Sequence, residues 1–190
     1  GTGGTSALVF EKLRPFTAAI EEYTYTDISK SFLMHAEEQF AADAPYLRCR
    51  LFNVEQPLRG QSIDTGSYDV VIATNVLHAT RNMRTTLRNA KAALRQGGLL
   101  LINEINRFSL VAHLTFGLTE GWWLFEDEAL RIPGTPALDA AAWRRLLDAE
   151  GFEAVHFPAE SAHGLGQLVV AARSDGVIIQ LPAKARAASE

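Results

Sequence analysis

The chain has 190 residues, of which 47% are hydrophobic and 21% charged, and its formal net charge is −4. These values are typical of one globular domain with a sizeable core, and the acidic balance argues against electrostatic nucleic-acid binding. The single cysteine, Cys49, excludes an internal disulfide and a multi-cysteine metal site. No signal peptide or membrane-length apolar run is recognisable, so we expect a cytoplasmic protein that binds neither nucleic acid nor membrane.

The chain opens on a glycine-rich segment, residues 1–6, with the sequence GTGGTS. Glycines of this kind allow tight turning and a close backbone approach to a bound nucleotide, and they normally lie between a strand and a helix. No strand precedes the segment, so we expect the first strand to be truncated. Thr5 or Ser6 is expected to cap a helix that runs to about Arg14, before Pro15.

Strand and helix patterns then alternate along the chain. The expected strands cover residues 21–27, 46–53, 68–74, 99–105, 152–157 and 167–172. The expected helices cover residues 27–42, 83–95 and 138–150. The 68–74 strand is nearly all apolar, which is typical of a parallel strand covered on both faces. Gly97 and Gly98 are expected to end the 83–95 helix, and the irregular, aromatic residues 106–136 indicate a lid or an insertion.

This alternation predicts an α/β fold with a Rossmann-like, doubly wound and mostly parallel sheet. The short connection between the last two strands favours an antiparallel last strand. The combination is the architecture of the common S-adenosylmethionine-dependent methyltransferases. We expect one N-terminally truncated methyltransferase domain over residues 1–176 and a linker or tail over residues 177–190.

Ligands of such sheets bind at the carboxyl edge of the strands, so the residues at the strand ends are candidate binding residues. Asp27 ends the first predicted strand and is placed to accept hydrogen bonds from ribose hydroxyls, although it could equally be a helix cap. Asn53 ends the next strand and could pair with an adenine edge or simply form a turn.

His78 and Glu104 are the candidate catalytic pair. His78 lies in the segment NVLHAT that follows the 68–74 strand, and Glu104 lies near the end of the next buried strand. Adjacent strands lie about 5 Å apart, so the two side chains can share a hydrogen bond if their strands are neighbours. A carboxylate that holds an imidazole in one tautomer makes it a better general base. Alone, His78 fits an ordinary loop histidine; the joint placement favours catalysis.

Trp122 and Trp123 either wall an acyl pocket or anchor a lid to the core. No histidine has convincing metal-ligand spacing, so no metal site is predicted.

Several of these segments together resemble the C-methyltransferase domains of modular polyketide synthases. They are residues 1–6, 23–29, 68–80, 97–104 and 120–125. The resemblance covers Gly1 to about Gly176 and implies methylation of the α-carbon of a β-ketoacyl thioester. That substrate is held through phosphopantetheine on an acyl carrier protein, among the neighbouring polyketide synthase domains.

The resemblance also implies roles for individual residues. His78 matches the catalytic base and Glu104 the residue that orients it. The residues implied in binding S-adenosylmethionine are Gly1, Gly3, Gly4, Asp27, Asn53 and Asn75. Where the family has an acid on the adenine side, this chain has Asn53.

Two other functions remain open from the sequence. One is a non-catalytic, structural methyltransferase-like domain of a megasynthase. The other is an oxygen- or nitrogen-methyltransferase of the same fold.

Overall fold

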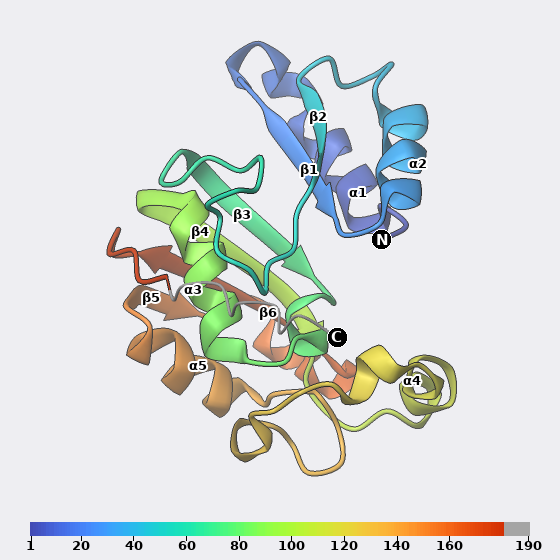
Figure 1. The fold of residues 1–190 in the computed structure, drawn as a ribbon, viewed down its shortest axis with the longest axis vertical. Coiled ribbons are helices and arrows are strands. Elements are labelled where there is room, and N and C mark those ends of the chain that lie inside the picture. Colours follow the sequence, from blue (N-terminus) through green and yellow to red (C-terminus); the bar gives the residue numbers. More distant parts are fainter. Residues whose placement is uncertain (181–190) are drawn as a thin grey trace, which may run out of the picture. The chain divides into compact units, whose positions relative to one another are not determined.

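The structure, a computed structural model, describes residues 1–180, and it divides into two compact units (Figure 1). One unit comprises Gly1–Asn53 with Arg59–Ile63, and the other comprises Val54–Leu58 with the chain from Asp64 onward. Most of the linker predicted over residues 177–190 lies outside the described residues, and the domain boundary at residue 176 stays a prediction.

The N-terminal unit is a parallel strand pair with two α-helices. Its elements are α1 (Gly4–Leu13), a 3₁₀ helix (Arg14–Ala19), β1 (Tyr23–Asp27), α2 (Lys30–Phe40) and β2 (Leu47–Leu51). Strands β1 and β2 run parallel, from Tyr23 opposite Leu47 to Asp27 opposite Leu51. The core of this unit contains an aromatic cluster, in which the ring of Phe10 lies 4.5 Å from that of Tyr23 and 5.0 Å from that of Phe40.

The first helix begins earlier than the sequence predicted. Gly3 is the N-cap of α1, with a left-handed φ of 79°, and no side chain caps the helix. Thr5 and Ser6 therefore lie inside α1 instead of preceding it. A glycine reaches the left-handed region without strain, so the chain turns into the helix at Gly3 and needs no side-chain cap there.

The second unit holds a four-stranded sheet in the order β3-β4-β6-β5. Its strands are β3 (Tyr68–Thr74), β4 (Leu94–Ile105), β5 (Phe152–His156) and β6 (Gln167–Ser174), and its α-helices are α3 (Met83–Ala93), α4 (Leu110–Thr115) and α5 (Ala140–Ala149). Strand β3 is parallel to β4, and β6 is antiparallel to both β4 and β5. The predicted α/β fold with a mostly parallel arrangement and an antiparallel last strand is confirmed.

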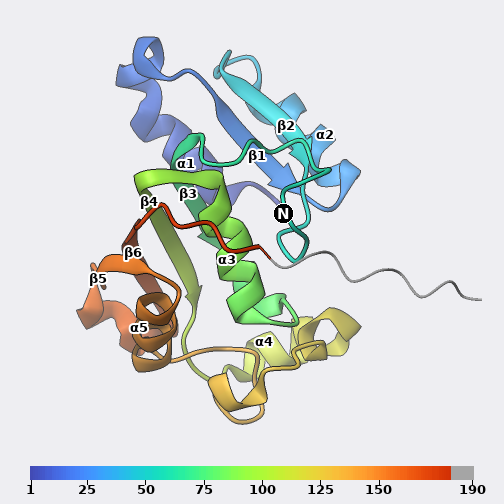
Figure 2. The ribbon, with the colours of Figure 1, turned by 60° about the vertical axis from the view of Figure 1, so that its left-hand side comes forward.

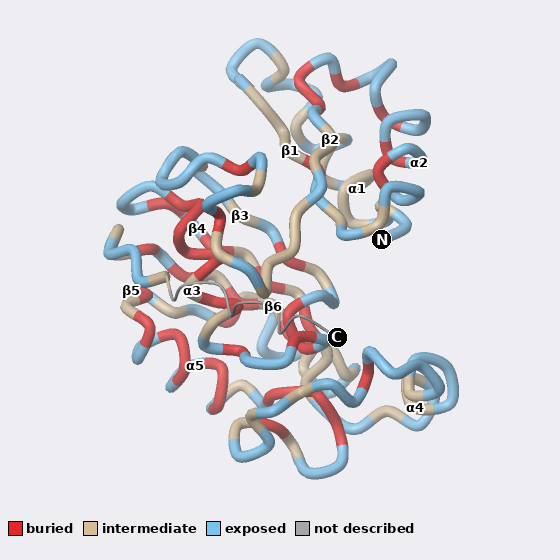
Figure 3. The backbone as a smooth tube through the Cα atoms, in the orientation of Figure 1, coloured by how far each residue is buried: buried red, intermediate tan, exposed pale blue. Residues whose placement is uncertain are grey.

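One face of this sheet is covered by α3 and α5 (Figures 2 and 3). Leu87 of α3 and Trp143 of α5 are fully buried with Leu100 of β4 in one core. On the strand β3, by contrast, Val70 is 43% and Ile72 38% exposed. Within this unit only one face of β3 has a helical layer, so the second cover that the sequence predicted does not come from this unit.

The predicted end of the third helix also differs. Helix α3 ends at Ala93 and β4 follows at once, so Gly97 and Gly98 lie inside the strand. The register against β3 shifts between Leu94 and Leu99, and Gly97 takes a φ of 75° in the intervening bulge. These glycines therefore lie in a bulge near the start of β4 and do not end helix α3.

Among residues 1–180, no helix is both long and apolar enough to cross a membrane.

Candidate active site

The candidate site is built where β3 and β4 end. Thr74 lies opposite Asn103 in the parallel ladder, and the amide of Asn75 donates to the carbonyl oxygen of Asn103 at 2.8 Å. Asn75 has a φ of 48°, in the left-handed region that asparagine tolerates better than most residues. The chain turns sharply there and enters a short 3₁₀ turn, Leu77–Ala79.

The side chain of Glu104, which comes from β4, contacts the centre of this turn and is completely buried. Its Oε1 accepts hydrogen bonds from the amide nitrogens of Val76, at 2.8 Å, and Leu77, at 2.7 Å. Its Oε2 contacts Nδ1 of His78, which is 6% exposed. The hydrogen bond expected between His78 and Glu104 is therefore present, and the buried carboxylate is satisfied through both oxygens.

This contact fixes how the imidazole is used. A carboxylate at Glu104 accepts a hydrogen bond from Nδ1–H of His78, and in this tautomer the neutral ring has its lone pair on Nε2. Nε2 of His78 has no hydrogen-bond partner among the described residues. The arrangement can therefore take up a proton at Nε2 and leave the positive charge beside a carboxylate.

The two tryptophans predicted for the pocket lie in different environments. Trp122 is 5% exposed, and its indole packs edge-on to the ring of His78 with 5.6 Å between centroids. The same indole packs against His113, at 5.4 Å. Trp123 is 49% exposed and donates from Nε1 to the carbonyl oxygen of Gly117 at 2.8 Å. Trp122 thus borders the candidate base, whereas Trp123 points away from the core.

The glycine segment and Asp27 meet at the end of β1 in the other unit. The amino nitrogen of Gly1 contacts Oδ2 of Asp27, and the hydroxyl of Tyr25 donates to the carbonyl oxygen of Gly1 at 2.8 Å. The other carboxylate oxygen of Asp27 accepts from the amide of Ser29 at 2.8 Å. Both alternatives considered for Asp27 thus keep a structural basis, since it lies at the glycine segment and also hydrogen-bonds at the start of α2.

Asn53 and Asn75 lie in different units. The backbone of Asn53 is bracketed by Gln61, whose Oε1 accepts from the Asn53 amide at 2.8 Å and whose Nε2 donates to its carbonyl oxygen at 3.1 Å. This bracket gives Asn53 a structural part in the loop after β2.

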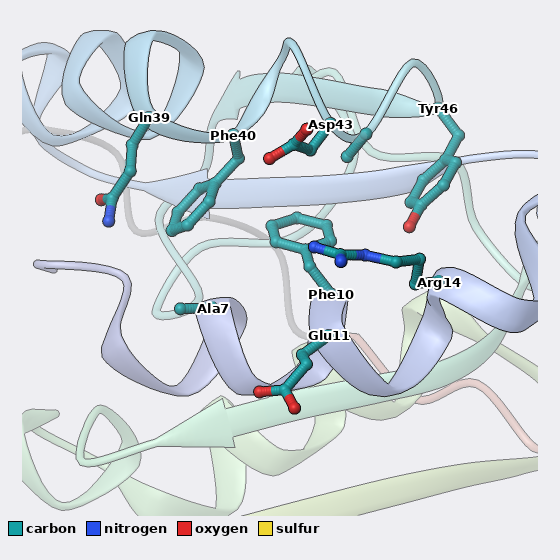
Figure 4. Close-up of a pocket in the computed structure, with 9 residues that line it drawn as sticks. Ala7, Phe10, Glu11, Arg14, Gln39, Phe40, Asp43 and Tyr46 are labelled. Atoms are coloured by element: carbon teal, nitrogen blue, oxygen red, sulfur yellow. The ribbon is translucent and has the colours of Figure 1, made fainter.

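A cavity of about 480 Å³ lies between α1 and α2, and Figure 4 shows Phe10, Phe40 and Tyr46 among the residues that line it. None of the predicted site residues lines it. The candidate site is therefore defined by side-chain geometry at the strand ends. Among residues 1–180 no group of three histidine, cysteine or acidic side chains is arranged to hold a metal ion.

Sequence reasoning missed one residue of this site, Arg131. It is 6% exposed, and its Nη1 donates to the carbonyl oxygen of His78 at 2.7 Å. The available signal was the spacing of Asp127 and Arg131, four residues apart, which forms an ion pair of 2.7 Å.

The reversed last strand, the glycine-led helix α1 and the buried histidine–glutamate pair are the features that the sequence associates with an S-adenosylmethionine-dependent methyltransferase. A family profile described as a methyltransferase domain matches residues 1–100. The chain belongs to this family of methyltransferase domains.

The relatives are polyketide synthases. The chain is 58% identical over 180 residues to polyketide synthase PksR of Bacillus subtilis, covering 95% of this chain and 7% of that protein. It is 50% identical over 175 residues to polyketide synthase ThaQ of Burkholderia thailandensis, covering 92% of this chain and 8% of that protein. The chain thus spans less than a tenth of these relatives.

Solved methyltransferase structures are also similar to this chain. The DszA carbon methyltransferase superposes with a TM-score of 0.87 at 38% identity, over 94% of this chain and 46% of that chain. The trans-methyltransferase CalH, solved in complex with SAH, gives a TM-score of 0.79 at 33% identity, over 92% of this chain and 49% of that chain. The chain is thus similar to segments of polyketide synthases and to solved methyltransferases, one of them a carbon methyltransferase.

The residues of the glycine segment fit this cofactor. A Cβ at Gly3 would lie 2.9 Å from Cε2 of the Phe40 ring, so only glycine gives the backbone its course at the start of α1. The amides at that helix N-terminus favour an anionic group, and a carboxylate at the end of β1 suits ribose hydroxyls.

Proposed function

We propose that this domain methylates the α-carbon of a β-ketoacyl thioester, with His78 as the general base and Glu104 as its orienting partner. The observation that carries the proposal is the buried carboxylate of Glu104, which holds Nδ1 of His78 and leaves Nε2 available. Further support comes from the carbon methyltransferases among the similar solved structures.

The chemistry requires one proton to leave carbon. A carbon between a ketone and a thioester is acidic enough for an imidazole to deprotonate near neutral pH. Nε2 of His78 takes that proton, and Glu104 stabilises the imidazolium through Nδ1. Trp122 packs against the imidazole and limits the water around it.

S-adenosylmethionine supplies, when bound, the electrophilic methyl group that the deprotonated carbon accepts. We infer that Gly1, Gly3, Gly4 and Asp27 hold this cofactor, with Asn53 and Asn75. Holding the carbon and the methyl group in contact provides much of the rate.

The substrate carrier and the setting are part of the proposal. We infer that the thioester is presented on the phosphopantetheine arm of an acyl carrier protein and that neighbouring synthase domains supply and consume it. The similarity to parts of polyketide synthases supports this inference. We also infer a cytoplasmic location, which fractionation of the source cells would test.

Replacing the base tests the proposal directly. In the full-length protein, His78→Ala and His78→Gln are expected to abolish methyl transfer to a β-ketoacyl thioester, because no group is left to remove the α-proton. Calorimetry should still detect S-adenosylmethionine binding. The control is His156→Ala, because His156 is an exposed histidine of β5 in the same unit.

Undiminished turnover in the His78 variants would refute the base assignment. Mass spectrometry that locates the added methyl on oxygen or nitrogen would instead favour a heteroatom methyltransferase. Absence of cofactor binding by the unaltered protein would favour a structural, non-catalytic domain.

A further inference from the structure

The turn that carries His78 is held on its C-terminal side by a second segment, Glu126–Arg131. The amide of Glu126 donates to the carbonyl oxygen of Arg81 at 2.8 Å. The carboxylate of Asp127 accepts from the amide of Met83, the first residue of α3, at 2.7 Å. Backbone groups that would otherwise be free at a helix start are therefore satisfied from this segment.

Arg131 completes the arrangement with a buried guanidinium. Its Nη1 donates to the carbonyl oxygens of His78 and Pro136, both at 2.7 Å, and its Nη2 donates to that of Thr80 at 2.9 Å. Its Nε donates to Asp127 Oδ1 at 2.7 Å. The guanidinium also lies over the ring of Phe125, 5.4 Å from its centroid.

These contacts explain how a charge can lie in the interior. The side chain of Arg131 is 1% exposed, so removing it from water carries a large desolvation cost. Four hydrogen bonds and the charge of Asp127 offset that cost. The planar fork of arginine can reach carbonyl groups in several directions at once, which the point charge of lysine cannot.

The histidine is consequently fixed from two sides. Glu104 holds the amides of Val76 and Leu77 and the Nδ1 of His78. Arg131 holds the carbonyl oxygens of His78 and Thr80. The peptide group of His78 then has little freedom to rotate, and the direction of its imidazole is set by the backbone as well as by Glu104.

We propose that Arg131 is a positioning residue for His78: it fixes the backbone of the turn so that Nε2 keeps its aim at the α-proton. The inference rests on the proposed role of His78 as the base. It predicts that Arg131 affects proton removal without changing the affinity for the thioester.

The test is α-proton exchange in deuterium oxide, measured by NMR on an acetoacetyl-pantetheine thioester, with the full-length protein and no added S-adenosylmethionine. Arg131→Lys keeps the positive charge and most of the side-chain volume, but it lacks the planar guanidinium with its several N–H donors. We expect its kcat for exchange to fall ~10-fold or more with KM within about two-fold, because small misplacements of a reacting group are costly.

Arg144→Lys is the matched control. Arg144 also donates to a backbone carbonyl oxygen, that of Val155 at 2.9 Å, and lies over the ring of Phe157 at 4.9 Å. It makes no hydrogen bond to the His78 turn, so its replacement should leave kcat and KM unchanged. Circular dichroism melting gives the folded fraction of each variant at the assay temperature.

A wild-type kcat in Arg131→Lys, or one that becomes wild-type after correction for the folded fraction, overturns the inference while His78→Ala remains inactive. Exchange above the enzyme-free rate that persists in His78→Ala overturns the proposed base as well. If Arg131→Lys does not fold, Asp127→Asn decides, because it weakens the ion pair that orients the guanidinium. A smaller loss of kcat with unchanged KM supports the inference, and no loss overturns it.

Discussion

Gly3 is the N-cap of α1 within the glycine segment. Its backbone conformation is one that only glycine adopts without strain. Its φ is 79°, and a Cβ there would meet the ring of Phe40, which is itself 8% exposed in the core. Phe40 also packs against Phe10, so its ring cannot move aside freely. A side chain at this position therefore carries both backbone strain and a steric clash.

Gly3→Ala is expected to lower the free energy of unfolding by about 1–3 kcal/mol, from strain at a left-handed residue plus displacement of Phe40. It should also weaken S-adenosylmethionine binding in calorimetry. Gly4→Ala is the matched control for stability, because a Cβ at Gly4 meets nothing within 4 Å and the residue begins a helix. We expect Gly4→Ala to be neutral or stabilising in denaturant titrations; equal losses in both variants would contradict the argument.

At the scale of elements, α3, the end of α5 and the end of β6 are joined by buried charges. Lys91 of α3 is 2% exposed and donates to the carbonyl oxygen of Glu150 at 2.5 Å and to Asp175 at 2.8 Å. Glu150 itself is 4% exposed and accepts from Arg84 and Arg88. Lys91 and Glu150 thus have partners for their buried charges, and these contacts connect the three elements at one junction.

Asp175 makes this junction sensitive to acid. Its partial burial acts to raise the pKa of the carboxyl, but hydrogen bonds from Lys91 and from the amide of Val177 outweigh burial and lower that pKa below its ordinary value. A carboxyl with a lowered pKa in the folded state stabilises the fold above its unfolded pKa, about 3.9. That stabilisation is lost as the pH falls through the lower, folded-state pKa.

We therefore expect the free energy of unfolding to decrease as the pH is lowered below about 4. Asp175→Asn should reduce the stability at neutral pH and flatten this acid dependence in urea titrations. Asp69→Asn serves as the control, because Asp69 pairs with Arg95 at a side chain that is 69% exposed. An unchanged acid slope in Asp175→Asn would contradict the assignment.

On the scale of the whole molecule, the helices of the second unit cover only one face of its four-stranded sheet. Ile72 of β3 is 38% exposed, whereas Ile102 of the adjacent β4 is 1% exposed in the core under α3 and α5. Two isoleucines in hydrogen-bonded strands thus differ mainly in which face their side chains occupy.

The same change at both positions, Ile72→Thr and Ile102→Thr, tests this difference in burial between the two faces of the sheet. Ile102→Thr should lower the free energy of unfolding by about 2–3 kcal/mol, since it removes buried apolar surface and buries a hydroxyl. Ile72→Thr should cost less than about 1 kcal/mol. Denaturant titration of both variants gives the comparison, and equal costs in the full-length protein would mean that another segment covers the β3 face.

The sequence alone predicted the order of strands and helices well, because the residue patterns that specify them are local. Apolar runs gave the strands β3 and β4, and spaced apolar residues gave α3 and α5. Helix ends were less predictable: Gly3 replaced Thr5 or Ser6 as the cap, and Gly97 and Gly98 formed a strand bulge. Each stretch holds more than one glycine, and the local sequence does not mark which of them takes the left-handed φ.

The pairing of His78 with Glu104 followed from the sequence because neighbouring parallel strands bring their ends together whatever the side chains are. Only the tertiary structure revealed Arg131, since a guanidinium 53 residues away from His78 reaches backbone carbonyl groups that no motif marks. It also decided that Trp122 is buried while Trp123 is exposed, and that the helices of the second unit cover only one face of β3. Local patterns determine elements and the edge where chemistry gathers, whereas burial and long-range hydrogen bonds depend on which segments meet in space.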